Sequence, residues 1–259
     1  MDLSIEKEEG ENMFYVDVGE VRIFTTWAAH ESDITNWIHE VSKIYRTKGR
    51  PRKNQLLLAL VADRWYIEKY KKKEEKQPFH TLQLCIGVHC LLAELEIWNI
   101  WNPKSLRNFL NGFGIKVVGV GIEETVKKLE KCHGWVMPPV IELRELAEKN
   151  EEVIKKIKEN SEETSKVDLS KHKIAKLAKL VLGEETSFVK PTDLQWWSPD
   201  DNDRLSEEKV MYATLETFLV SQMGVKLLRT TSPLSATVAQ AFFFQGSGLI
   251  INIQNYLSV

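Results

Sequence analysis

Seven consecutive apolar residues, LLLALVA at positions 56–62, constrain the fold of this chain more than any other feature. A basic segment around Gly49 and Pro51 precedes this run, and a charged segment at residues 69–76 follows it. A strand that is apolar at every position buries both of its faces, whereas a strand with one solvated face alternates. The run therefore predicts a central strand in a sheet that is covered by helices on both sides.

The segments around this run alternate between strand and helix patterns. Residues 13–28 predict a β-hairpin, and residues 80–85 and 89–95 predict a second hairpin. Shorter strands are expected at 116–120 and 140–143. The order of elements indicates an α/β sandwich with a mixed sheet, and not a βαβ repeat of the dinucleotide-binding type. Apolar residues at helical spacing predict helices over residues 31–45, 105–110, 123–132 and 206–223. A further helix is expected to begin at Asp168 or Ser170 and to end at Gly183, with the apolar residues at 174–181 on one face.

The chain has 259 residues, 43% of them hydrophobic and 28% charged, which is an ordinary globular composition. We expect a domain at 13–229 between a flexible N-terminus at 1–12 and an uncharged tail at 230–259. Residues 147–167 are dense in Glu, Lys, Asn and Ser and indicate a mobile insert or a solvated helix. Polar residues interrupt the tail too often for a membrane span of about 20 apolar residues. Its role is left open between an extra strand, a partner-binding segment and an aberrant C-terminus.

Charge and cysteine content limit the partners and the compartment. The formal net charge is −2, so the chain lacks the overall basic surplus of many nucleic-acid binders. A phosphate-binding surface would have to come from local clustering. The three cysteines indicate a reducing compartment, the nucleus or the cytoplasm. The lysines that could cluster on one helix are Lys171, Lys173, Lys176 and Lys179.

Four stretches of the chain carry a resemblance to a known family. They are His80–Cys85 (HTLQLC), Ser105–Leu110 (SLRNFL), Val118–Ile122 (VGVGI) and Leu205–Ala213 (LSEEKVMYA). In order and spacing these stretches resemble the Werner-syndrome-like 3'-5' exonuclease family, and most of all its plant members. The resemblance covers roughly residues 13–228. It implies an RNase H-like fold, membership of the DEDDy group of exonucleases, and removal of nucleotides from the 3' ends of DNA or RNA.

The resemblance also implies a site that holds two Mg²⁺ or Mn²⁺ ions with four carboxylates. An Asp-x-Glu pair should lie on the first buried strand, here near Asp63, but every register keeps at most one carboxylate. The pair would be Ala62 and Arg64, Asp63 and Trp65, or Val61 and Asp63.

The second and third motifs also depart from the family pattern. Thr125 takes the place of an Asp after Gly121, and the adjacent Glu124 is turned by about 100° around a helix. Tyr212 and Glu216 lie four residues apart, the spacing of the family's Tyr and last Asp, although Glu216 is one methylene longer.

These departures predict a degenerate exonuclease domain, a pseudoenzyme, in which Asp63 and Glu216 are weak metal ligands and Thr125 and Tyr212 occupy family site positions. Such a protein would bind DNA or RNA, or pair with an active relative, with no tightly bound metal. The alternative is an active metal-dependent enzyme that uses Asp63, Glu216 and an acid at 123 or 124. Purely structural roles are open as well: Asp63 in a turn, Thr125 at a helix start, Tyr212 in the core and Glu216 in solvent.

Overall fold

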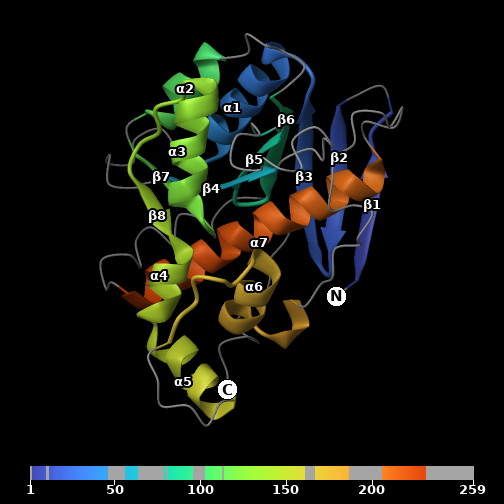
Figure 1. Cartoon of the computed structure of the whole chain (residues 1–259). Coiled ribbons are helices and arrows are strands. Elements are labelled where there is room, and N and C mark those ends of the chain that lie inside the picture. Colours follow the sequence, from blue (N-terminus) through green and yellow to red (C-terminus); the bar gives the residue numbers. More distant parts are fainter. Residues whose placement is uncertain are drawn as a thin grey trace, which may run out of the picture.

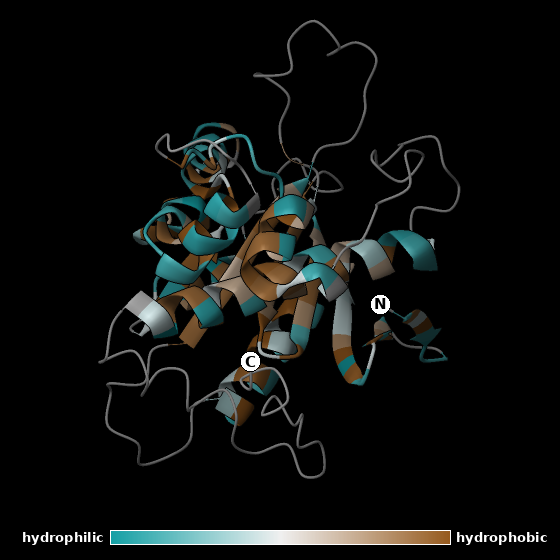
Figure 2. Cartoon of the chain, turned by 90° about the horizontal axis from the view of Figure 1, so that it is seen from below, coloured by the Kyte–Doolittle hydropathy of each residue, from teal (hydrophilic) through white to brown (hydrophobic). Residues whose placement is uncertain are grey.

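The computed structural model describes residues 2–9, 12–45, 56–63, 79, 81–95, 103–112, 114–160, 167–186 and 206–231. These residues form three layers, with a mixed sheet between two layers of helices (Figure 1). Hydrophobic residues gather toward the centre of the molecule, and hydrophilic residues prevail on the peripheral helices (Figure 2). The predicted α/β sandwich is therefore confirmed.

Among the described residues, eight strands form one sheet in the order β1-β2-β3-β6-β5-β4-β7-β8. The pairs β3-β6, β4-β7 and β7-β8 are parallel, and the other neighbours are antiparallel. Both predicted hairpins are present, although His80 lies outside the described residues. The strands are β1 (Leu3–Lys7), β2 (Met13–Val18), β3 (Val21–Ala28), β4 (Leu56–Asp63), β5 (Thr81–Ile86), β6 (His89–Glu94), β7 (Ile115–Gly119) and β8 (Val140–Glu142).

Strand β4 is the apolar run, and it lies inside the sheet between β5 and β7. Leu57 and Ala59 belong to the core cluster on one face, while Leu58 and Leu60 belong to the cluster on the other face. Each leucine that leaves water in this way contributes roughly 1.5–3 kcal/mol to stability. Burial on both faces is thus the reason that this strand has no polar alternation.

Different sets of helices cover the two faces of the sheet. The helices α1 (Glu31–Tyr45), α2 (Lys104–Leu110) and α3 (Ile122–His133) cover one face of the sheet. On the other face, α7 (Glu207–Thr231) crosses the strands diagonally (Figure 1). Three shorter helices pack beside α7, namely α4 (Leu143–Glu148), α5 (Glu151–Asn160) and α6 (Ile174–Leu182), and a 3-10 turn follows at Glu184–Thr186.

The structure differs from the sequence expectations at several boundaries. Strand β1 lies inside the segment 1–12 that we expected to be flexible, because Leu3 and Ile5 pack against the core. Helix α5 lies within 147–167, where the sequence left a mobile insert or a solvated helix open. Helix α7 runs on to Thr231 and buries Leu227. The charged segment 69–76 and the tail from residue 232 lie outside the described residues. No helix in the described part of the chain is long and apolar enough to cross a membrane.

The close approach of β7 to β4 predicts that Gly119→Ala is destabilising. A Cβ atom at this position would lie 2.9 Å from the carbonyl oxygen of Leu60 and 2.9 Å from Cβ of Ile122. Because a backbone atom cannot move aside cheaply, we expect a loss of about 1–3 kcal/mol in the free energy of unfolding, measured by urea denaturation. Glu130→Ala, at an exposed position of α3, is the control and should change it by less than about 0.5 kcal/mol. An unchanged midpoint for Gly119→Ala would contradict this view of the contact.

Candidate functional site

The stretches that carry the predicted site residues meet at one edge of the sheet. Strands β4 and β7 are parallel neighbours, so their carboxyl ends lie together. Asp63 ends β4, while β7 leads into α3 through Gly121, whose φ of 68° suits glycine. Helix α7 crosses the same strands and carries Tyr212 and Glu216. This edge is therefore the candidate site.

A buried chain of hydrogen bonds links three elements at this edge. The Gln83 side chain donates from Nε2 to the Asp63 carboxylate at 2.9 Å, and its Oε1 is 2.9 Å from the Thr217 hydroxyl. Gln83 and Thr217 are both fully buried. The single hydroxyl proton of Thr217 is shared with the carbonyl of Ala213, 2.8 Å away. Asp63 is thus held by an amide that ties β4 to β5 and α7, and is more than a residue of an exposed turn.

Successive residues of β4 face opposite sides of the sheet, and this distinguishes the possible registers of the first motif. Val61 pairs with Gln83 and belongs to the cluster under α7, so Val61 and Asp63 both face α7. Ala62 instead packs against the cluster on the opposite face of the sheet. Arg64 and Trp65 lie outside the described residues. An Asp-x-Glu pair whose first residue faces α7 would therefore begin at position 61 or 63, and not at position 62.

Thr125 lies one turn into α3, and its side chain bonds to its own helix. Its hydroxyl donates to the carbonyl oxygen of Gly121 at 3.1 Å, and its amide donates to the same oxygen at 3.2 Å. Serine and threonine in helices commonly bond back to the preceding turn in this way. This contact fits the role of Thr125 as a helix residue.

Tyr212 and Glu216 share one side of α7, next to the side that meets the sheet. The sheet-facing side is marked by Thr214, whose hydroxyl lies 3.0 Å from that of Thr25, and by Thr217. Tyr212 is partly buried against the core cluster, and Glu216 is partly exposed. The two residues keep the one-turn spacing that the sequence predicted.

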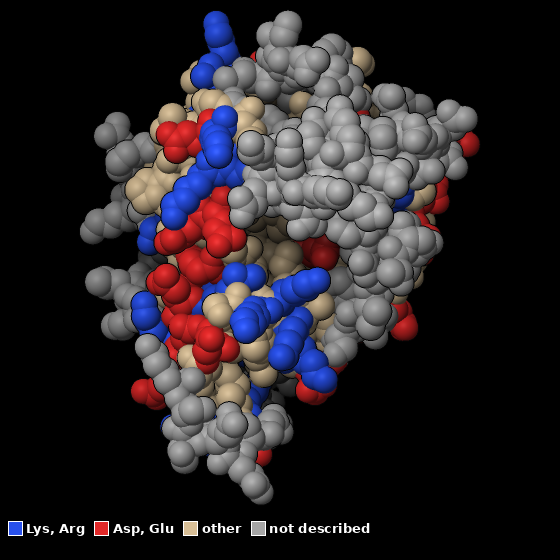
Figure 3. All heavy atoms as spheres, viewed as in Figure 1, with Lys and Arg blue, Asp and Glu red and all other residues tan. Residues whose placement is uncertain are grey.

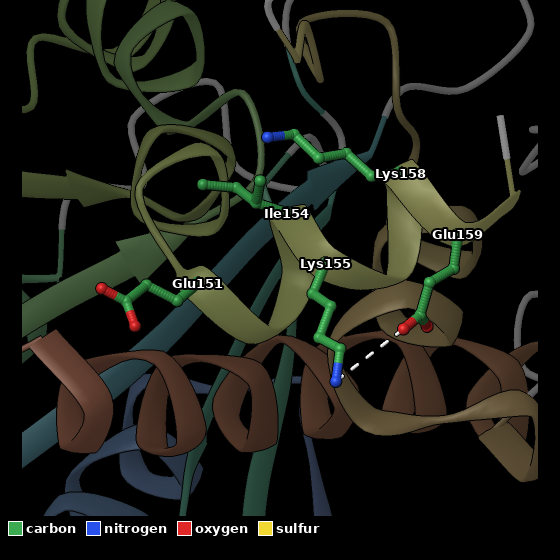
Figure 4. Close-up of a pocket in the computed structure, with 5 residues that line it drawn as sticks. All are labelled: Glu151, Ile154, Lys155, Lys158 and Glu159. Atoms are coloured by element: carbon green, nitrogen blue, oxygen red, sulfur yellow. Dashed lines mark ion pairs between the residues drawn. The ribbon is translucent and has the colours of Figure 1, made fainter. Parts of the chain in front are cut away.

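The described residues contain no group of three or more His, Cys, Asp or Glu side chains that could hold a metal ion. A pocket of about 370 Å³ lies elsewhere, on α5, where Lys155 and Glu159 form an ion pair at 3.8 Å (Figure 4). It is lined by Glu151, Ile154 and Lys158 as well and contains none of the predicted site residues.

Sequence reasoning missed the groups that organise the start of α3. The Glu142 carboxylate accepts from the amide of Ile122 at 2.9 Å and from the amide of Arg144 at 3.1 Å, so it caps α3 and α4 together. The Arg144 guanidinium lies beside Gly121 and donates from Nε to the carbonyl of His172 at 2.9 Å. No motif marks these contacts. Gln83, by contrast, stands out as the one amide in the strand TLQLCI.

Comparison with solved structures identifies the fold of this chain. The sequence matches no protein-family model, and no curated protein matches it. The structure is similar to Escherichia coli RNase D, an exoribonuclease involved in structured RNA processing (TM-score 0.56, 14% identity), over 84% of this chain and 48% of that chain. It is also similar to the Aedes aegypti Nibbler EXO domain (TM-score 0.54, 11% identity), over 84% of this chain and 95% of that domain.

The fold is that of RNase H-like 3'-5' exonuclease domains. The chain spans about half the length of the RNase D chain. A weaker likeness, with a TM-score of 0.38 and 19% identity, is to the EXD2 exonuclease domain soaked in Mg and GMP, over 83% of this chain and 93% of that domain. At these identities the likenesses to RNase D and to the Nibbler EXO domain establish the fold alone.

The buried hydrogen-bond chain predicts that Gln83→Leu is destabilising. Removing the amide takes one donor from the Asp63 carboxylate inside the protein, so we expect a loss of about 1–3 kcal/mol in the free energy of unfolding. In a double-mutant cycle, Gln83→Leu and Thr217→Val should couple by at least about 0.5 kcal/mol. Gln83 and Thr25 share no hydrogen-bond partner, so the losses in the free energy of unfolding from Gln83→Leu and Thr25→Val should be additive. Additivity of the first pair would show that the Gln83 to Thr217 bond does not contribute.

Proposed function

We propose that this protein is a degenerate 3'-5' exonuclease domain of the Werner-like type, which binds nucleic acid and has lost most or all metal-dependent hydrolysis. The proposal rests on which residues occupy the site positions of the family and on the contacts that these residues make. The Asp63 carboxylate is engaged by Gln83, the Thr125 hydroxyl bonds to its own helix, and Val61 is apolar. Among the described positions, only Asp63 and Glu216 offer a carboxylate.

Electrostatics support the loss of hydrolysis. Two-metal hydrolysis holds two divalent ions about 4 Å apart, and Mg²⁺ needs hard oxygen ligands in near-octahedral geometry. Two carboxylates balance only half of the four positive charges that two such ions bring, and Arg144 adds a further cation beside Gly121. This donor set does not fit a pair of ions. The protein would then hold a 3' end without cutting it, alone or beside an active relative.

The alternative is an active exonuclease, favoured by the fold shared with proteins described as exonucleases. In that case Asp63 and Glu216 would be joined by Glu123 or Glu124, which are exposed in the first turn of α3. An acid at either position would have to reach across from the start of α3 to the end of β4.

Incubation with a labelled single strand or a recessed 3' end, with Mg²⁺ or Mn²⁺, separates the two functions. We expect retention of the strand without shortening, because the site lacks ligands for both ions. A ladder of shortened products that disappears in Glu216→Ala would establish the enzyme instead, and binding of neither substrate would remove the proposal altogether.

Restoring the missing carboxylates should create activity if the scaffold is intact. The variant Val61→Asp, Asp63→Glu, Thr125→Asp and Glu216→Asp places acids on the α7 face of β4, so we expect metal-dependent shortening and a rise in melting temperature with Mn²⁺. The matched control carries Ala62→Asp and Arg64→Glu in place of the first two changes. It should stay inactive, because Ala62 faces the other side of the sheet. Equal activity of both variants would refute the register that we assign.

A further inference from the structure

Basic side chains gather on the outer face of α6. Lys176 and Lys179 are exposed on α6, and Lys173 is exposed at the N-cap that precedes it. The buried residues Leu177 and Ala178 of the same helix belong to the core cluster under α7. Figure 3 shows Lys and Arg side chains over α6 along one rim of a hollow, with a belt of acidic side chains over α3 and α4 beside them. Although the net charge of the chain is −2, positive charge thus gathers at this place on the described part of the face shown in Figure 3.

Only part of this positive charge is neutralised. Lys179 forms an ion pair with Glu184 at 2.5 Å, and Lys171 lies close enough to Asp168 to lower the pKa of that carboxyl, together with the stronger effect of the Ser170 hydrogen bonds. Within the described ranges, Lys173 and Lys176 make no ion pair. These two lysines are therefore the ones on α6 that are available to an outside anion.

Arg144 extends the basic surface from α6 to the start of α3. Its Nε bond to His172 fixes the guanidinium, and its two terminal nitrogens would lie 3.5 and 3.7 Å from a Cβ atom on Gly121. The pKa of His172 is lowered by burial and then by the charges of Lys176 and Arg144, which places both cations around this histidine. Arg144 thus joins the lysines of α6 to the predicted second motif.

We propose that Arg144, Lys173 and Lys176 form a phosphate track, a surface that binds the phosphodiester backbone of a single-stranded nucleic acid as it passes the hollow seen in Figure 3. This inference rests on the function proposed above, and it identifies the surface through which the protein would bind nucleic acid. A guanidinium fork can take two phosphate oxygens, and lysines act as point charges along the same backbone.

A nucleic-acid strand fits this surface better than other anions do. Lys173 and Lys176 are three residues apart, so their Cα atoms are separated by about 4.5 Å along the helix axis, and Arg144 continues the row toward α3. A row of cations suits a ligand with repeated negative charges, and contact with the backbone requires no particular base. The neighbouring acidic belt would repel a polyanion and keep it on the lysine side.

The test compares two variants that lose the same two positive charges. Lys173→Gln with Lys176→Gln removes the track lysines, whereas Lys149→Gln with Lys155→Gln removes lysines that are paired with Glu145 and Glu159. Fluorescence anisotropy with labelled oligo-dT and oligo-U strands of about 20 nucleotides measures affinity over a series of salt concentrations. All four lysines are exposed, so the folds should be retained, and the unfolding midpoints check this.

We expect the track variant to bind roughly tenfold more weakly at low salt, with a log–log salt dependence reduced by about 1.4, since each contact on a single strand contributes about 0.7. The control variant should stay within about twofold of the parent. Arg144→Lys should also weaken binding, because the charge remains but the fork is lost.

The outcomes separate this inference from the function on which it rests. If the parent protein binds neither strand, the proposed function fails and the track fails with it. If the parent binds but both double variants bind equally, the track alone is wrong and the strand lies elsewhere. Displacement of the strand by polyglutamate at equal charge concentration would assign the surface to an acidic protein segment and overturn the proposal.

Discussion

Burial of β4 on both faces is the constraint on which the rest of this structure depends. The strand has to be covered by α1, α2 and α3 on one side and by α7 on the other, and this fixes a three-layer arrangement. It also places the end of β4 under α7, where the partly buried Asp63 accepts a hydrogen bond from Gln83. The chain Asp63, Gln83, Thr217 is that solution, and it ties the candidate site to the core.

Much of the fold follows from the sequence, because apolar periodicity reports burial directly. The run at 56–62, the two hairpins and the helices α1, α2 and α3 lie within a few residues of the predicted bounds. The helix expected from Asp168 or Ser170 begins only at Ile174, α7 extends beyond the expected end at residue 223 to Thr231, and α4 was not predicted. The sequence did not predict β1, because its alternating residues are mostly charged or polar and only Leu3 and Ile5 contact the core. A short edge strand depends on its neighbour β2 more than on its own pattern.

The candidate site was only partly predictable. The family spacing located Asp63, Thr125, Tyr212 and Glu216 on the elements that meet at one edge of the sheet, but it could not assign the register of the first motif. That assignment needs the faces of β4, which the pairing of Val61 with Gln83 supplies. Glu142 and Arg144 escaped prediction because their partners are backbone groups 20 to 28 residues away in the chain.

The double role of Glu142 has a mechanical consequence. One carboxylate satisfies the first amides of two helices, so neither helix start can move far without breaking a bond to the other. Arg144, the second residue of α4, donates a hydrogen bond to the carbonyl of His172 in the segment in front of α6. A displacement of the glycine turn that opens α3 would therefore strain bonds that reach, through Glu142 and Arg144, the segment in front of α6.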